Sequence, residues 1–115
     1  MLYLLVLINV VLLVFGQVLW KMEMGRLKGP LTLEAVPRLL TSPFIWGGLF
    51  VYVLATVLWF YILSRGKLSV VYPLQSLAYV LGVLAALLIF REAVPLTRWL
   101  GVGLIVLGAF FVAWK

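Results

Sequence analysis

The chain has 115 residues, of which 67% are hydrophobic and only 10% are charged, with a formal net charge of +6 at pH 7. So little polar surface excludes a water-soluble domain of this length and predicts an all-α integral membrane protein. With no cysteine, no histidine and three carboxylates, we expect no enzyme, metal site or cofactor, and the scattered basic residues indicate lipid headgroups rather than nucleic acid.

The first predicted membrane span covers residues 3–20, in which Asn9 and Gln17 are the only strongly polar residues. The run is too long for a signal-peptide core and has neither a basic start nor a small-residue cleavage site, so we expect it to be retained. Asn9 and Gln17 share one helix face, with Gly16 beside them. They either form interhelical hydrogen bonds or line a transport pathway, and the sequence favours neither.

A polar connection, residues 21–42, follows the first span. It starts with the charged residues Lys21, Glu23, Arg26 and Lys28, and Gly29-Pro30 then breaks the chain. Residues 32–40 place apolar side chains at helical spacing opposite Glu34 and Arg38, which predicts a short amphipathic segment in the membrane interface, limited by Pro37. Ser42-Pro43 then predicts an N-cap with proline at the first helical position.

Three further spans are predicted over residues 44–63, 68–90 and 98–114, with Lys115 closing the last. Each of the five tryptophans falls within a few residues of a predicted helix end, as an aromatic belt requires. We therefore expect one four-helix domain over residues 1–115. Six of the nine basic residues belong to the first and third connections, which by the positive-inside rule favours both termini outside the cytoplasm, with dual insertion as the alternative.

The third span contains no charge but carries a polar stripe: Ser69, Tyr72, Ser76 and Tyr79 share one face, and Gln75 borders it. Such groups are costly against lipid, so we expect this face to line the pathway. Pro73 cannot donate a hydrogen bond to the carbonyl at Ser69, so the helix should bend or loosen there. The alternative is a proline kink held together by local hydrogen bonds.

The fourth span carries a GxxLIxxG pattern, formed by Gly101, Leu104, Ile105 and Gly108. Two glycines on one helix face let another helix approach closely. Four helices enclose little space, and transporters build their sites between paired repeats, so we expect a homodimer or a paired small subunit with these four residues at the interface. The alternative is that the glycines pack against the chain's own third helix.

The segments LSVVYPLQSLAYVLGVL and FREAVPLTRWLGVGLIVLGAF resemble the drug/metabolite transporter superfamily, specifically its four-helix members and the EamA-type repeat. GQVLWK is similar to the end of the first helix of the small multidrug resistance transporters, and GxxLIxxG to their dimerisation motif. In that family a glutamate three residues before the glycine binds protons or the cationic drug. Here that position is Leu13, and no predicted span contains a carboxylate.

The resemblance therefore implies the branch of the superfamily that moves lipid-linked sugars across the bacterial cytoplasmic membrane, similar to the small subunits that flip aminoarabinose-phosphoundecaprenol. Its partners would be membrane lipids and a polyprenyl-phosphate-linked substrate, an anion that calls for cations at the membrane edge and a polar slot for the sugar. The candidate substrate-binding residues are Asn9, Gln17, Lys21, Tyr72, Gln75, Ser76 and Tyr79.

Glu92 matches the glutamate often found before the last helix of EamA-type repeats, and one interpretation pairs it with Arg91 or Arg98. Two alternative functions stay open at this point. One is a small cation or metabolite exporter of the multidrug type. The other is an accessory membrane subunit that anchors a glycosyltransferase.

Overall fold

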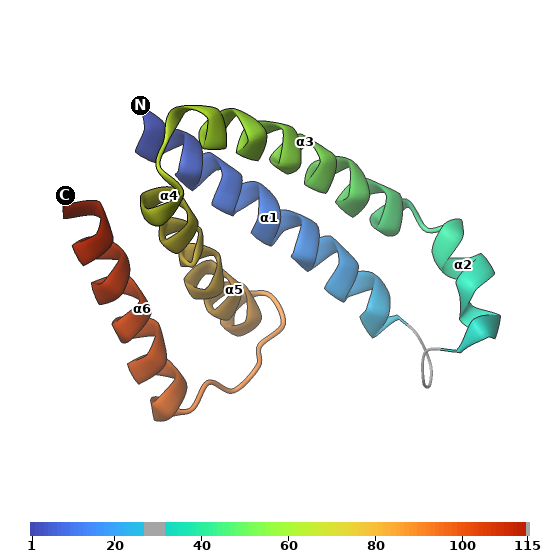
Figure 1. Cartoon of the computed structure of the whole chain (residues 1–115). Helices are drawn as coiled ribbons and strands as arrows, with labels where there is room; N and C mark the ends of the chain where they lie inside the picture. The colour runs from blue at the N-terminus through green and yellow to red at the C-terminus, as the bar shows by residue number, and fades with distance from the viewer. Residues whose placement is uncertain (27–31, 115) are drawn as a thin grey trace.

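The computed structural model describes residues 1–26 and 32–114, and it shows a bundle of helices (Figure 1). Four helical segments of the described chain are long and apolar enough to cross a membrane. They are α1 (Leu2–Gly25), α3 (Pro43–Arg65), the segment Leu68–Leu88 and α6 (Leu96–Trp114). This confirms the predicted class, an all-α membrane protein with four spans. The predicted break at Gly29-Pro30, as well as Lys28 and Lys115, lies outside the described residues.

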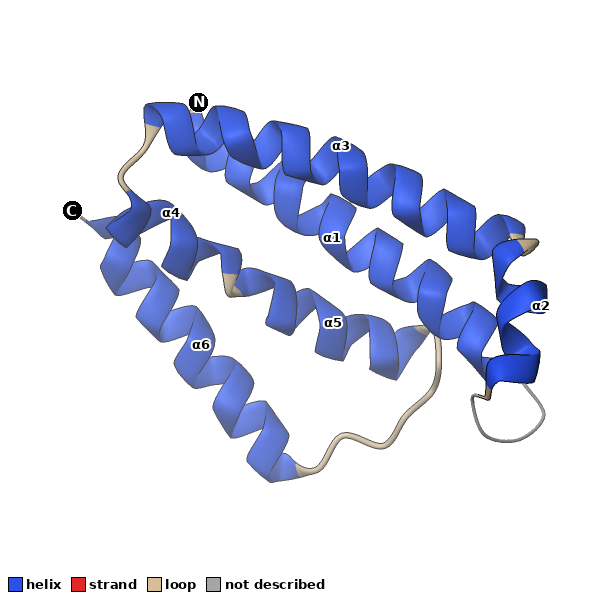
Figure 2. Ribbon diagram, turned by 45° about the vertical axis from the view of Figure 1, so that its right-hand side comes forward, coloured by secondary structure: helices blue, strands red, loops and turns tan. Residues whose placement is uncertain are grey.

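The helices α1 and α3 form an antiparallel pair that lies side by side in both views (Figures 1 and 2). Two glycines bring them together. A Cβ atom on Gly16 would lie 2.7 Å from Cδ2 of Tyr52, and a Cβ atom on Gly48 would overlap the indole of Trp20. Each glycine thus leaves room for an aromatic ring of the opposite helix, and the two rings stack with their centroids 4.7 Å apart. This α1–α3 pair is the frame on which the rest of the bundle is built.

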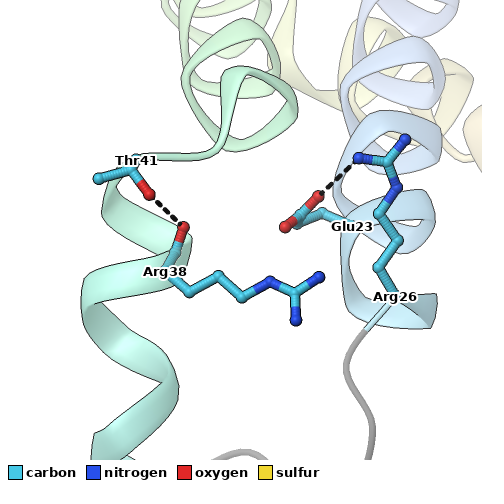
Figure 3. Close-up of polar contacts among 4 residues, drawn as sticks. All are labelled: Glu23, Arg26, Arg38 and Thr41. Carbon is cyan, nitrogen blue, oxygen red and sulfur yellow. Dashed lines mark hydrogen bonds and ion pairs between the residues drawn. The ribbon is translucent and has the colours of Figure 1, made fainter.

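α1 continues for five residues beyond the predicted end of the first span, to Gly25. The expectation that Glu23 lies in a loop is therefore wrong: it is helical and only 3% exposed. Residues 21–24 are good helix formers, so the helix outlasts the apolar run. Oε2 of Glu23 lies 3.8 Å from Nη1 of Arg26, and Figure 3 shows Arg38 reaching toward the same carboxylate from α2.

The connection between α1 and α3 contains a short 3₁₀ helix, Leu33–Ala35, and α2 (Val36–Leu40). Pro37 stands at the start of α2, a position where its missing N–H is harmless, and Thr41 Oγ1 donates to the Arg38 carbonyl at 2.9 Å (Figure 3). Leu33 is 89% exposed, so the apolar side of this segment is not covered by the described chain. Its place in the membrane interface stays a prediction.

Ser42 and Pro43 occupy the N-cap and first helical positions of α3, as predicted. The hydroxyl of Ser42 makes no capping hydrogen bond, however, and its Oγ is buried without a partner among the described residues. The sequence pattern therefore locates the helix start correctly, while the backbone and the proline ring, rather than the serine side chain, define it.

The third span is divided into α4 (Leu68–Gln75) and α5 (Leu77–Leu88), with Ser76 between them (Figure 2). The predicted loosening at Ser69 is displaced: α4 runs through Pro73 and the interruption follows it. Only one turn of α4 precedes Pro73, so the lost bond falls in that first turn, where little helix exists to bend. At the interruption, the N–H of Ser76 donates to the Pro73 carbonyl at 3.0 Å, and the N–H of Tyr79 donates to the Ser76 carbonyl at 2.9 Å. Both bonds join residues three apart, as in a 3₁₀ turn.

α6 contacts α4 and α5, and Ala109 is its buried residue. Its carboxyl-terminal end lies near the start of α1, where the Tyr3 hydroxyl donates to the Ala113 carbonyl at 3.2 Å (Figure 1). A Cβ atom on Gly101 or Gly108 would meet no atom of the described chain within 4 Å. The glycines therefore do not pack closely against the third span; Leu104 and Gly108 are exposed on this glycine face of α6, while Gly101 and Ile105 are half-buried.

Candidate functional site

A cavity of about 840 Å³ lies between α1, α4–α5 and the connection that leads into α6. α1 contributes one face of its second half, from Leu13 to Lys21, and α3 contributes Tyr52. α4 and α5 contribute the residues on both sides of the interruption at Ser76, and Arg98 stands at the entry to α6. The broken third span therefore forms one wall and the α1–α3 pair forms the other.

Six of the seven predicted substrate-binding residues line this cavity: Gln17, Lys21, Tyr72, Gln75, Ser76 and Tyr79. Pro73 lines it as well. Tyr72 is 61% exposed and Tyr79 is 69% exposed, so both rings present surface that a ligand can reach. The fold thus brings the polar stripe of the third span opposite the polar face of the first.

Asn9 is the seventh residue, and the structure places it outside the cavity. It is fully buried, with Nδ2 donating to the Ala55 carbonyl at 2.6 Å. Its Oδ1 accepts a hydrogen bond from Nε2 of Gln75 at 3.2 Å. Asn9 therefore ties α1 to α3 and to the end of α4. Of the two roles that the sequence left open, Asn9 has the packing role and Gln17 lies on the cavity.

Tyr52 is a cavity residue that the sequence analysis missed. Nε2 of Gln17 donates to its hydroxyl at 2.6 Å, while its ring stacks on Trp20. As an acceptor of that bond, the phenol keeps its own hydrogen for another partner, and Gln17 keeps a carbonyl oxygen. The signal in the sequence was a tyrosine in the middle of a span, away from the interfaces where membrane tyrosines gather.

Charged side chains occupy one end of the cavity. Lys21 comes from the last part of α1, Arg98 from the start of α6, and Glu92 from the connection before it. The pairing of Glu92 with Arg91 or Arg98 does not form: in residues 1–26 and 32–114, the one ion pair within 4.0 Å joins Arg26 and Glu23. The end of the cavity therefore presents two cations and one carboxylate.

The wall deeper in the cavity is uncharged. Leu13 lines it at the position where the small multidrug resistance family would carry its glutamate. Within the described chain, the carboxylate on the cavity surface is Glu92, outside the helices. The arrangement suits an anionic group at the charged end, neutral hydrogen-bonding groups beside Gln17 and Tyr52, and an apolar portion along the remaining wall.

Comparison with known proteins places these features in a family. The model of the EamA-like transporter family matches residues 1–114. A probable 4-amino-4-deoxy-L-arabinose-phosphoundecaprenol flippase subunit ArnE of Aeromonas hydrophila is 36% identical over 73 residues, covering 64% of each chain. The corresponding protein of Pseudomonas fluorescens is 37% identical over 67 residues, covering 58% of this chain and 59% of its own.

The protein of the same name from Yersinia pseudotuberculosis is 41% identical over 61 residues, covering 53% of this chain and 54% of its own. The chain thus spans between about half and two thirds of the length of the curated relatives it matches. No solved structure matches. The match over residues 1–114 shows that this four-span chain belongs to the EamA-like transporter family.

Proposed function

We propose that this protein is a subunit of a transporter that moves a polyprenyl-phosphate-linked sugar across the bacterial cytoplasmic membrane. The observation that carries the proposal is the polarity of the cavity, which is charged at one end and neutral along the wall formed by the spans. The relatives named as flippase subunits support the same substrate class.

The phosphate is assigned to the charged end. Lys21 and Arg98 are exposed on the cavity, and neither is held in an ion pair within the described residues. Lysine binds phosphate as a point charge and arginine binds it through a planar fork, so together they suit a phosphodiester. Because both sit at helix ends, the phosphate stays at the level of the lipid headgroups while the rest of the substrate enters the cavity.

The sugar is assigned to the neutral wall, where Gln17, Tyr52, Gln75 and Ser76 offer donors and acceptors. Sugar hydroxyls are both donors and acceptors and match such groups. A transporter must also release its substrate on the far side, which neutral hydrogen bonds permit more readily than buried ion pairs. Leu13, Val18 and Val83 supply apolar wall for the start of the prenyl chain.

The uncharged wall of the cavity argues against a proton-coupled exporter of cationic drugs. Such an exchanger needs an acid inside the membrane, whose protonation competes with the cation. Leu13 occupies that position on the cavity, and the described spans bring no carboxylate to its surface.

We assign the glycine face of α6 to a second subunit, either another copy or a paired small protein, as the word subunit in the relatives' names supports.

The test combines detection of bound lipid with transport. The full chain, purified in mild detergent with whatever subunit accompanies it, is examined by native mass spectrometry and then reconstituted for a flipping assay with a polyprenyl-phosphate sugar. We expect bound polyprenyl lipid and transport, and a loss of both in the double variant Lys21→Ala/Arg98→Ala. Lys67→Ala is the control, since Lys67 is exposed and off the cavity. Neither lipid nor transport in the wild type would refute the proposal.

A further inference from the structure

Glu92 is held at the charged end of the cavity by an unusual turn. The residue before it, Arg91, has φ of 54°, the one positive value among non-glycine residues in the part of the chain that the structure describes. Residues with an L side chain are strained in this conformation. Strained backbone positions of this kind are most common at functional sites. The N–H of Glu92 then donates to the Ala86 carbonyl at 2.9 Å, which ties the turn to the last part of α5.

Glu92 lines the same cavity as Lys21 and Arg98, yet no ion pair within 4.0 Å joins its carboxylate to either in the described chain. A site that bound phosphate alone would gain nothing from a carboxylate there, because the two anions repel each other. An unpaired acidic residue in the same cavity as two basic residues instead fits a ligand that carries both signs of charge.

The geometry points to Glu92 as a specificity-determining residue that binds an ammonium group on the sugar, while Lys21 and Arg98 contact the phosphate. This assignment rests on the proposed function. The relatives' names describe an amino-deoxy sugar joined to a phosphoprenol, whose amine is protonated at neutral pH and whose phosphodiester is anionic. Such a head group is complementary to two cations and one carboxylate.

Glu92 should also weaken the binding of a lipid whose sugar carries no amine. A polyprenyl phosphate whose sugar lacks a free amine would leave the carboxylate facing the phosphate with no cation from the ligand to offset it. Discrimination by an unmatched charge is a general route to specificity. Because Glu92 is exposed, we expect a preference of about fivefold for the aminated lipid, the scale of an exposed ion pair.

The experiment measures a ratio of two affinities on the full chain in lipid nanodiscs. The probes are polyprenyl-phosphate-linked 4-amino-4-deoxyarabinose and its N-acetyl derivative, which keeps the sugar, the phosphate and the prenyl chain but removes the positive charge. We expect the wild type to prefer the free amine about fivefold, and Glu92→Gln to bind the two lipids alike. Glu92→Asp should restore part of the preference.

Glu34→Gln is the matched control, because Glu34 is also an exposed carboxylate but lies off the cavity, and it should keep the wild-type ratio. High salt should bring the wild-type ratio toward one, which tests the charge without any substitution. A wild-type protein that binds both lipids equally, or a Glu92→Gln variant that keeps the preference, overturns the role of Glu92 and leaves the proposed function standing. A wild type that binds neither lipid refutes the proposed function itself.

Discussion

Gln75 and Asn9 are joined across the bundle by a hydrogen bond of 3.2 Å, from the amide nitrogen of Gln75 to the side-chain oxygen of Asn9. Gln75 is the last residue of α4, immediately before the interruption of the third span. Asn9 belongs to α1 and is buried where that helix packs against α3. The bond therefore links the first half of the broken span to the α1–α3 pair, while the second half, α5, packs against α1 and α6. It also orients an amide that lines the cavity.

Replacing Asn9 with leucine should lower the Tm of the purified protein. The change removes the hydrogen bonds to Ala55 and Gln75 and leaves the Gln75 amide without its partner, which we expect to cost about 1–2 kcal/mol. Thermal unfolding in detergent, measured by circular dichroism, is the readout. A double-mutant cycle with Gln75→Leu should show coupling between the two sites, and strictly additive effects would argue against the link.

Gly48→Ala should destabilise the α1–α3 pair. The added methyl group would overlap the indole of Trp20, and displacing that ring disturbs its stacking on Tyr52. Overpacking of this kind costs about 1–3 kcal/mol, partly offset by the better helix propensity of alanine. The neighbouring Gly47→Ala is the control, since its Cβ atom would lie 3.6 Å from Leu19, an ordinary contact. Equal melting curves for the two variants would contradict the close approach.

Tyr52→Phe should weaken binding of the sugar without unfolding the protein. The phenylalanine ring keeps its place on Trp20, but Gln17 loses its partner and the cavity loses a hydroxyl. We expect about a fivefold lower affinity for a polyprenyl-phosphate sugar, the value of one hydrogen bond near 1 kcal/mol, and an unchanged affinity for polyprenyl phosphate without a sugar. Tyr61→Phe, which alters an exposed ring off the cavity, should leave both affinities unchanged.

Replacing both Gly101 and Gly108 with leucine should prevent assembly with a second subunit while the four-span fold stays intact. A Cβ atom at either position would meet no atom of the described chain within 4 Å, so we expect the subunit itself to tolerate a side chain there. The close helix approach that a GxxLIxxG face allows is lost, however. Native mass spectrometry gives the assembly state and circular dichroism gives the fold. Gly103→Leu, on another side of α6, is the control, and dimers in the double variant would refute this interface.

The four spans could be predicted from the sequence because bilayer thickness fixes the length of an apolar run. The end of α1 could not, since Glu23 is helical and buried where hydropathy already signals a loop. Hydropathy predicts where the chain leaves the membrane, whereas the end of a helix also depends on the helix propensity of the residues that follow. At the membrane edge these two positions differ. The interruption at Ser76 was likewise displaced from the predicted position, because only one turn precedes Pro73.

Most of the cavity residues could also be predicted, because polar side chains inside a span must face protein or water. The separation of Asn9 from Gln17 needed three-dimensional information: both are polar and share a face, but only the position of α3 decides which one is buried. Tyr52 was missed for a related reason. Its role depends on Gln17 of another helix, 35 residues away, and its own surroundings in the sequence are apolar.

The central claim, that the cavity between the broken third span and α1 binds a polyprenyl-phosphate sugar, is tested most directly by photo-crosslinking in membranes. A photoreactive amino acid is placed at Tyr79, on the cavity, or at Phe60, which is exposed and off it. Mass spectrometry then identifies the attached lipid. We expect polyprenyl-phosphate sugar at position 79, displaced by an excess of the unlabelled lipid, and only bulk phospholipid at position 60. Equal labelling at both positions, or none that the excess lipid displaces, would contradict the claim.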